Sequence, residues 1–202
     1  MTTGYRPGPA RVAGPADIEA VVDTMTTAFF EDPLWGPAFP DADRRATQAA
    51  ALWRCYVTSA LRYPWLLVTP GVESAASWIP PGGTELTAAE EERLEGLLTE
   101  VAGAAVAGPI MRICEQLEEA HPTEPHFYLS LLATHDQHRG KGLGMGLLAE
   151  SLRRVDALGA PAYLESSNPA NLPRYERAGF VARDRITVAG GQVVTTMWRP
   201  AR

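Results

Sequence analysis

The chain has 202 residues, of which 46% are hydrophobic, and its formal net charge is -6. This length and apolar content are enough for one hydrophobic core, so we expect residues 1–202 to form a single domain without a linker or repeat. The acidic balance argues against nucleic-acid binding, and neither a membrane helix nor a signal-peptide core at residues 1–8 is present, so we expect a cytoplasmic protein without a membrane partner.

The first part of the chain alternates helix and strand patterns. Apolar residues recur at helical spacing from Ile18 until a break near Phe30, and Thr87 with Glu90 forms a capping box for a later helix. Between and after these signals, branched and aromatic runs predict strands, and proline and glycine mark the turns. The predicted elements are a strand at 11–13, helices at 18–30, 42–63, 87–101 and 109–120, and a hairpin of strands at 65–69 and 74–79.

The second part begins with an apolar strand candidate at residues 127–134. An apolar stripe from Leu143 to Leu158 then predicts a helix that Gly159 ends, and residues 162–165 form another short strand candidate. A strand, helix, strand unit with right-handed crossover makes its two strands parallel.

The turn between the first of these strands and the helix is rich in glycine, from Gln137 to Gly146. Backbone amides at a helix N-terminus bind anionic oxygens when no side chain blocks the approach. A nucleoside triphosphate loop requires Ser or Thr after Gly-Lys, but Gly142 follows Lys141. The dinucleotide pattern fails as well, because its last glycine position is Met145 or Leu147.

The turn instead resembles the acetyl-coenzyme A signature of the GCN5-related N-acetyltransferase (GNAT) family. The matching residues are Arg139, Gly140, Lys141, Gly142, Leu143 and Gly144. A second hallmark of the family, Asn, six residues, Tyr and then Gly-Phe, is matched from Asn168 to Phe180. The resemblance implies an α/β (α+β) GNAT fold, in which helices flank one mixed sheet of about six to seven strands and parallel strands 4 and 5 splay apart. It also implies acetyl-coenzyme A as co-substrate.

Within the family, the segment from Glu124 to Arg177 resembles the puromycin N-acetyltransferase group. Before Glu124 this likeness is thin, and that half supplies much of the acceptor pocket in the family. We therefore expect an acetyl-coenzyme A half at about residues 123–202 and an acceptor half at about residues 1–122. The reaction class transfers better than the identity of the acceptor.

The resemblance also implies roles for single residues. The main chain of Leu132, Ala133 and Thr134 would pair with the pantetheine arm and polarise the thioester carbonyl, and residues 139–144 would hold the diphosphate. Asn168 or Asn171 would contact coenzyme A, and Tyr175 would be the acid that protonates the departing thiolate. The base has three open alternatives: Glu165, or Glu31 or Asp32 acting through water. The amine could also arrive neutral.

The acceptor is expected to be a small-molecule amine in an aromatic pocket. Phe29, Phe30 and Trp35 are favoured as its lining because they lie at the break between two helices, with Glu31 beside them. A protein or peptide N-acetyltransferase and a catalytically silent acetyl-coenzyme A-binding module are the alternatives. Cys55 and Cys114 are isolated in the sequence, and His135 and His138 lack partner ligands, so no metal is expected. Separately, we expect the protein to be a monomer or a homodimer.

Overall fold

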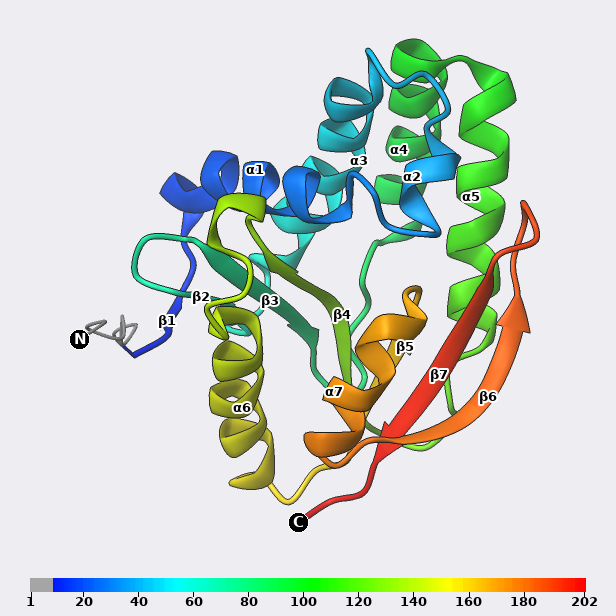
Figure 1. The fold of residues 1–202 in the computed structure, drawn as a ribbon. Coiled ribbons are helices and arrows are strands. Elements are labelled where there is room, and N and C mark those ends of the chain that lie inside the picture. Colours follow the sequence, from blue (N-terminus) through cyan, green and yellow to red (C-terminus); the bar gives the residue numbers. More distant parts are fainter. Residues whose placement is uncertain (1–8) are drawn as a thin grey trace.

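A computed structural model describes residues 9–202 and shows one mixed sheet with helices on both sides (Figure 1). The segment 1–8, in which no signal-peptide core is expected, lies outside the described residues. The strands are β1 (Arg11–Val12), β2 (Leu66–Val68), β3 (Ser74–Ile79), β4 (Phe127–Thr134), β5 (Ala162–Ser166), β6 (Val181–Thr187) and β7 (Val193–Arg199). The helices are α1 (Ile18–Phe29), α2 (Trp35–Ala38), α3 (Arg45–Ala60), α4 (Ala88–Ala102), α5 (Ala104–Glu119), α6 (Leu143–Asp156) and α7 (Leu172–Arg177).

The seven strands of this sheet follow the order β1-β2-β3-β4-β5-β7-β6. Among the described strands, β4 and β5 form the parallel pair, and the other neighbours are antiparallel. Helix α6 is the crossover between β4 and β5, as the strand, glycine turn, helix, strand pattern predicts. The predicted mixed sheet with flanking helices is therefore confirmed.

Strands β4 and β5 stay paired for only a short distance. Their ladder ends at Leu129 opposite Leu164, although β4 continues to Thr134. At the same point a bulge interrupts the pairing of β4 with β3, because Ser77 lies opposite Leu131 whereas Trp78 lies opposite Leu129. Ser130 is the extra residue. A bulge bends its strand and increases the local twist, so it accounts for the separation that opens a gap between the two strands.

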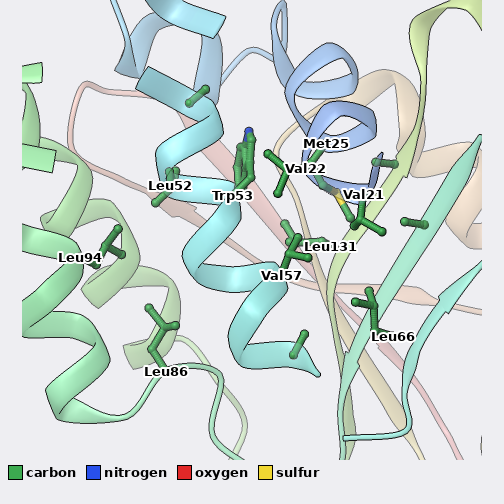
Figure 2. Packing of buried hydrophobic residues seen from close by; sticks show 14 of the residues in the cluster. Val21, Val22, Met25, Leu52, Trp53, Val57, Leu66, Leu86, Leu94 and Leu131 are labelled. Carbon is green, nitrogen blue, oxygen red and sulfur yellow. The ribbon is translucent and has the colours of Figure 1, made fainter. Parts of the chain in front are cut away.

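The bulge also changes which face of the sheet the β4 side chains enter. Before it, Phe127 and Leu129 pack in the cluster that α6 covers. After it, Leu131 and Ala133 pack in the cluster formed with α1, α3 and α4 (Figure 2). One inserted residue reverses the alternation of a strand. The outer half of β4 (residues 131–134) therefore packs in a different core cluster from the inner half (residues 127–129).

Two predicted helices differ from the structure by more than two residues at an end. The helix predicted at 42–63 is Arg45–Ala60, because the Asp41 carboxylate accepts the amides of Asp43 and Arg44 and holds a turn there (3.1 and 3.3 Å). The helix predicted from Pro109 begins five residues earlier, at Ala104, so Pro109 lies inside α5. Gly103, at φ 86°, separates α4 from this alanine-rich first turn, which has high helix propensity. None of the helices in the described residues combines the length and the apolar composition of a membrane span.

Candidate active site

A groove of about 580 Å³ runs along the open edge of β4, between the start of α6 and α7. It brings together two segments that are distant in the sequence, the glycine turn and the stretch after β5. Its lining includes Leu132, Ala133, Thr134, Arg139, Gly140, Gly142, Leu143, Gly144, Asn168, Asn171 and Tyr175. Of the residues predicted to hold coenzyme A, Lys141 alone is outside this lining.

The glycine turn presents an unobstructed backbone to the groove. Gly140 and Gly142 have φ angles of 78° and 75°, and Gly142 is the N-cap of α6. A Cβ atom built at either residue meets no atom within 4 Å. The first hydrogen bond within the helix runs from the Gly146 amide to the Gly142 carbonyl (2.9 Å), so the amides of Leu143, Gly144 and Met145 lack intrahelical partners. Free amides, positive helix dipole and open space together fit a diphosphate.

Gly144 has a different function in the turn. A Cβ atom there would lie 2.6 Å from Thr134 Oγ1, which itself is 2.7 Å from Ser74 Oγ. Glycine therefore allows the first turn of α6 to pack directly against β4. This contact fixes the helix N-terminus beside the gap between the strands.

The outer half of β4 has backbone groups that face the gap. The amide of His135 donates to Glu73 O on the β3 side (2.9 Å), and Ala133 O accepts a hydrogen bond from Ser74 Oγ (2.6 Å). Backbone direction alternates along a strand, so the amides of Leu132 and Thr134 point away from β3. These two amides are available to a ligand in the gap, whereas the main chain of Ala133 is engaged with β3.

Side chains around the groove are held in place by local hydrogen bonds. The Arg139 guanidinium donates to Ala28 O (2.8 Å) and Thr27 O (3.3 Å) at the end of α1, which ties the turn to that helix. Asn168 Oδ1 accepts the Ala170 amide (3.0 Å) and so shapes the loop after β5. Arg174 Nη1 donates to Asn171 Oδ1 (2.9 Å). Arg139 and Arg174 thus bring two positive charges to the groove.

A second, smaller cavity of about 100 Å³ adjoins the groove. Its lining comes from α1, α2, α3, α5 and α7, the loop before α4, the middle of β4, the end of β5 and the start of β7. Five residues line both cavities and therefore mark their junction: Phe29, Asp32, Leu132, Asn171 and Tyr175. A ligand in the small cavity lies next to the end of a ligand in the groove.

The wall of the small cavity is aromatic. Trp53 lies at the centre of this aromatic group. Its ring centroid is 5.0 Å from that of Phe29, 5.2 Å from that of Trp35 and 6.5 Å from that of Tyr56. The predicted lining residue Phe30 is not part of either cavity, because its ring packs under the Arg45 guanidinium at 5.0 Å. Spacing alone could not separate Phe29 from its neighbour Phe30, which points elsewhere.

The acidic residues near the helix break have different surroundings. Glu31 has 78% of its side chain exposed, lies 3.6 Å from Arg45, and lines the groove instead of the small cavity. Asp32 is buried: one oxygen accepts the amides of Leu34 (2.9 Å) and Trp35 (3.2 Å), and the other accepts Ser167 Oγ (2.8 Å). Asp32 therefore joins the start of α2 to the loop after β5.

Tyr175 lies on α7 at the junction of the two cavities. Its ring packs edge-on against Phe180, with centroids 6.2 Å apart. Burial, together with the negative charge of Asp32, raises the pKa of Tyr175 to about 12. The hydroxyl is therefore protonated at neutral pH and can supply a proton at this junction.

Glu165 lies at the end of β5 in the small cavity, with only 4% of its side chain exposed. One oxygen accepts Tyr128 Oη (2.8 Å), and the other accepts Tyr163 Oη (2.9 Å) and lies 3.3 Å from His121 Nε2. Burial lowers the pKa of His121, but the hydrogen bond and charge of Glu165 outweigh it, so that pKa is raised overall. Glu165 is thus the centre of a hydrogen-bond network.

Glu85 is a second carboxylate of the cavity, and sequence reasoning missed it. It precedes the capping box of α4 in a loop, where a glutamate has no periodicity or motif to distinguish it. Ser130 Oγ, on the bulge of β4, donates a hydrogen bond to Glu85 Oε1. Burial, with the charges of Glu165 and Glu118, raises the pKa of Glu85 to about 7, although Ser130 and His121 act in the opposite direction.

Among residues 9–202, no group of three or more His, Cys, Asp and Glu side chains is arranged to hold a metal ion. His135 pairs with Asp23 (3.2 Å) and Asp136 (3.0 Å). Cys114 accepts a hydrogen bond from Tyr56 Oη (3.2 Å) inside the protein.

A family model and several solved structures of acetyltransferases are similar to this chain. The family model described as an acetyltransferase (GNAT) domain matches residues 86–199. A solved structure described as histone acetyltransferase HPA2 and related acetyltransferase from Corynebacterium glutamicum is 25% identical, with a TM-score of 0.71 and coverage of 98% of both chains. The fold is also similar to a Drosophila melanogaster polyamine N-acetyltransferase, at 17% identity, TM-score 0.62 and coverage of 94% of this chain and 98% of that one. An agmatine N-acetyltransferase is similar at 16% identity, TM-score 0.61 and coverage of 94% and 97%. The chain therefore belongs to the GNAT family of acetyltransferases.

Proposed function

We propose that this acetyltransferase moves an acetyl group from acetyl-coenzyme A to the amine of a small molecule, by direct attack with both substrates bound. The observation that carries the proposal is the junction of the two cavities at Leu132 and Tyr175. Direct attack requires that the acceptor nitrogen and the thioester meet in one place, and the large groove and the small cavity meet there. Acetyl-coenzyme A supplies the activated acetyl group.

The groove residues divide the binding of acetyl-coenzyme A between them. The free amides at residues 143–145 and the open turn at Gly140 and Gly142 would hold the diphosphate. Arg139 and Arg174 add positive charge to the groove, and Asn168 and Asn171 line it after β5. The gap beside the outer half of β4 would receive the pantetheine arm, with the amides of Leu132 and Thr134 as donors.

Two groups at the junction would assist the transfer. An amide of β4, at Leu132, would donate to the thioester oxygen as negative charge develops on it. Tyr175, protonated at neutral pH, would give its proton to the departing sulfur. Glu165 remains a candidate for a role in proton removal, although both of its oxygens already accept hydrogen bonds.

The size and chemistry of the small cavity favour a compact amine. A volume of about 100 Å³ is well below the ~300–1,000 Å³ of drug-sized ligand pockets. Its lining combines aromatic rings with the carboxylates Glu85 and Glu165, which suits a cation with a short apolar body. A protein or peptide acceptor would require an extended groove on this side, so we favour a small molecule.

The likeness of residues 124–177 to the puromycin N-acetyltransferase group makes puromycin one acceptor worth testing, although the cavity is small for it. A cytoplasmic location, one domain over residues 1–202 and a monomeric or homodimeric state stay predictions of the sequence.

The proposal is tested by incubating the protein with acetyl-coenzyme A and one amine at a time, with release of free thiol as the readout. Agmatine, spermidine, phenethylamine, 2,2,2-trifluoroethylamine, puromycin and a lysine-rich peptide cover the alternatives. Thiol release with small amines but not with the peptide supports the proposal. Release with the peptide alone would favour a protein acetyltransferase, and binding of acetyl-coenzyme A without release would indicate a silent module.

A further inference from the structure

The small cavity contains a carboxylate, Glu85, that a distant strand holds in place. Glu85 lies in the loop before α4, yet its side chain reaches across to Ser130 on β4. Ser130 is the bulge residue at which β4 and β5 separate. The carboxylate is therefore held where the gap between the strands begins, two residues along β4 from Leu132.

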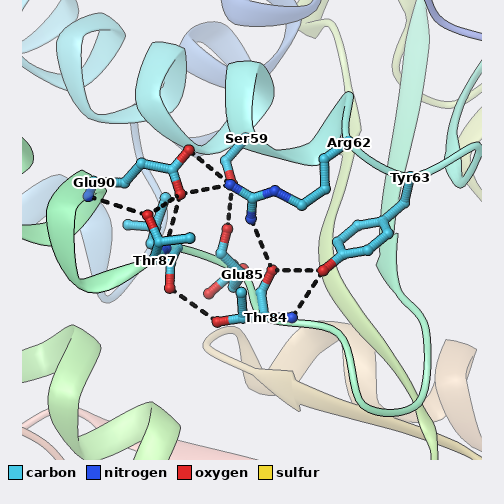
Figure 3. Close-up of polar contacts among 8 residues, drawn as sticks. Ser59, Arg62, Tyr63, Thr84, Glu85, Thr87 and Glu90 are labelled. Atoms are coloured by element: carbon cyan, nitrogen blue, oxygen red, sulfur yellow. Dashed lines mark hydrogen bonds and ion pairs between the residues drawn. The ribbon is translucent and has the colours of Figure 1, made fainter.

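The backbone around Glu85 is fixed by an extensive network (Figure 3). Ser59 Oγ on α3 donates to the Glu85 carbonyl, and Arg62 Nη1 donates to Thr84 O (3.2 Å). The amide of Thr84 in turn donates to Tyr63 Oη (2.9 Å).

On the other side of Glu85, Leu86 is buried in the core cluster with α3 and α4 (Figure 2). The capping box then follows: Thr87 N donates to Glu90 Oε2 (2.7 Å), and Arg62 binds the same carboxylate (2.6 Å). A loop with so many anchors holds its side chain in one place, as a catalytic group requires.

Of the carboxylates that line the small cavity, Glu85 and Glu165 differ in the hydrogen-bond capacity that remains to them. Glu165 has Tyr128, Tyr163 and His121 around its two oxygens. Glu85 accepts one hydrogen bond, from Ser130 to Oε1. A carboxylate has about four lone-pair sites, so Glu85 has more acceptor capacity for an incoming N–H group.

We propose that Glu85 is the general base of the acetyl transfer, with Ser130 as the residue that positions it. This inference rests on the proposed N-acetyltransferase function. An acceptor that enters as an ammonium ion gives one proton to Glu85, and its lone pair then forms the N–C bond to the acetyl carbon. The C–S bond breaks, the sulfur takes a proton from Tyr175, and the second proton of the nitrogen restores the Tyr175 hydroxyl. Glu85 releases its proton to solvent, so the acceptor loses two protons and coenzyme A gains one.

The charged and titratable groups that surround Glu85 determine how this base would respond to pH. They are Glu165 on β5, Cys114 and Glu118 on α5, His121 just after α5, Tyr56 on α3 and Tyr128 on β4. With a pKa of about 7, Glu85 is half ionised at neutral pH, which suits proton removal from an ammonium ion. The fraction of Glu85 that can act as a base therefore grows as pH rises through about 7.

The experiment compares the wild type with Glu85→Gln, and with Glu119→Gln as a matched control on the exposed face of α5 outside the cavity lining. The readout is kcat/KM for the best small amine against pH. In the wild type it should rise to a plateau with a midpoint near pH 7, because Glu85 can deprotonate the ammonium form. E85Q should lose about 10²–10⁴-fold at pH 7.5 and should keep rising until the amine itself is neutral. E119Q should match the wild type.

Ser130→Ala gives an independent test that a merely structural role would not pass. The Ser130 hydrogen bond lowers the pKa of Glu85, so its loss should move the midpoint to higher pH. With 2,2,2-trifluoroethylamine, whose nitrogen is largely neutral at pH 7, E85Q should lose much less activity than with an ordinary alkylamine.

An E85Q profile that coincides with the wild type would overturn the assignment of the base while leaving the acetyltransferase function intact. If E85Q does not fold, an unmoved midpoint in S130A would overturn it equally. Absence of acetyl transfer by the wild type to every amine would instead contradict the proposed function, and with it the role of Glu85.

Discussion

Replacement of Gly142 by alanine separates the two properties of the glycine turn, its backbone conformation and its open surface. Gly142 has a φ of 75°, where an L-residue costs about 1–2 kcal/mol. No atom lies within 4 Å of the new methyl group, so strain is the whole cost to folding. Part of it is offset by a less flexible unfolded chain, worth about 0.4–1 kcal/mol. We expect the free energy of unfolding to fall by about 1 kcal/mol.

The same substitution should have a larger effect on binding. The methyl group occupies groove space beside the free amides of α6, and a hydrogen bond to a charged group contributes about 1.5–3 kcal/mol. Loss of one such bond weakens coenzyme A binding about 10- to 150-fold. Isothermal titration calorimetry with coenzyme A measures this change, and urea denaturation measures the change in stability.

Gly146→Ala is the matched control for this experiment. Gly146 lies one turn further along α6, also with nothing within 4 Å of a built Cβ, but its φ is negative and it does not line the groove. Alanine there should stabilise the protein by about 0.5–1 kcal/mol and leave the affinity unchanged. Wild-type affinity in G142A, or equal losses in both variants, would refute the amide cradle.

Two further predictions concern Tyr175 and the ion pair of Arg199. Tyr175→Phe should lower kcat about 10²–10⁴-fold at unchanged coenzyme A affinity, and an unaltered kcat in steady-state assays would remove its role as the acid. Asp156→Asn removes the carboxylate charge that two nitrogens of the buried Arg199 guanidinium bind (2.5 and 2.8 Å), and should cost about 1–3 kcal/mol in urea denaturation at pH 7. Arg199 holds the pKa of Asp156 in the folded protein below its usual value. The stabilisation is therefore fully present above the pKa that Asp156 has in the unfolded chain, and it is lost as pH falls through the lower pKa of Asp156 in the folded protein. The difference between wild type and D156N should therefore shrink at acidic pH, and a constant difference would contradict the ion pair.

The sequence predicts the part of the protein that follows local rules. The strand at residues 127–134 has the predicted bounds, and the apolar stripe from Leu143 predicts α6 because one covered face imposes helical spacing. The positions of Gly140 and Gly142 predict an open turn because only glycine adopts these φ angles without strain.

What the sequence could not predict depends on contacts between distant segments. Glu85 lines the cavity because Ser130, distant in sequence, binds it, and the bulge at Ser130 leaves no pattern in the apolar run of β4. The sequence pattern predicts that a helix starts at Pro109, but the alanines before it extend α5. Phe29 and Phe30 are chemically identical neighbours, and packing against Trp53 or Arg45 distinguishes them.

The central claim is that free amides of the glycine turn and of outer β4 bind acetyl-coenzyme A. Hydrogen exchange of the wild type, followed at amide resolution with and without coenzyme A, tests it most directly. The claim predicts slower exchange at Gly140 to Met145 and at Thr134 once the groove is filled, and unchanged exchange in the β6–β7 hairpin at Gly190 and Gly191. Equal exchange rates at the glycine turn with and without saturating coenzyme A would contradict it.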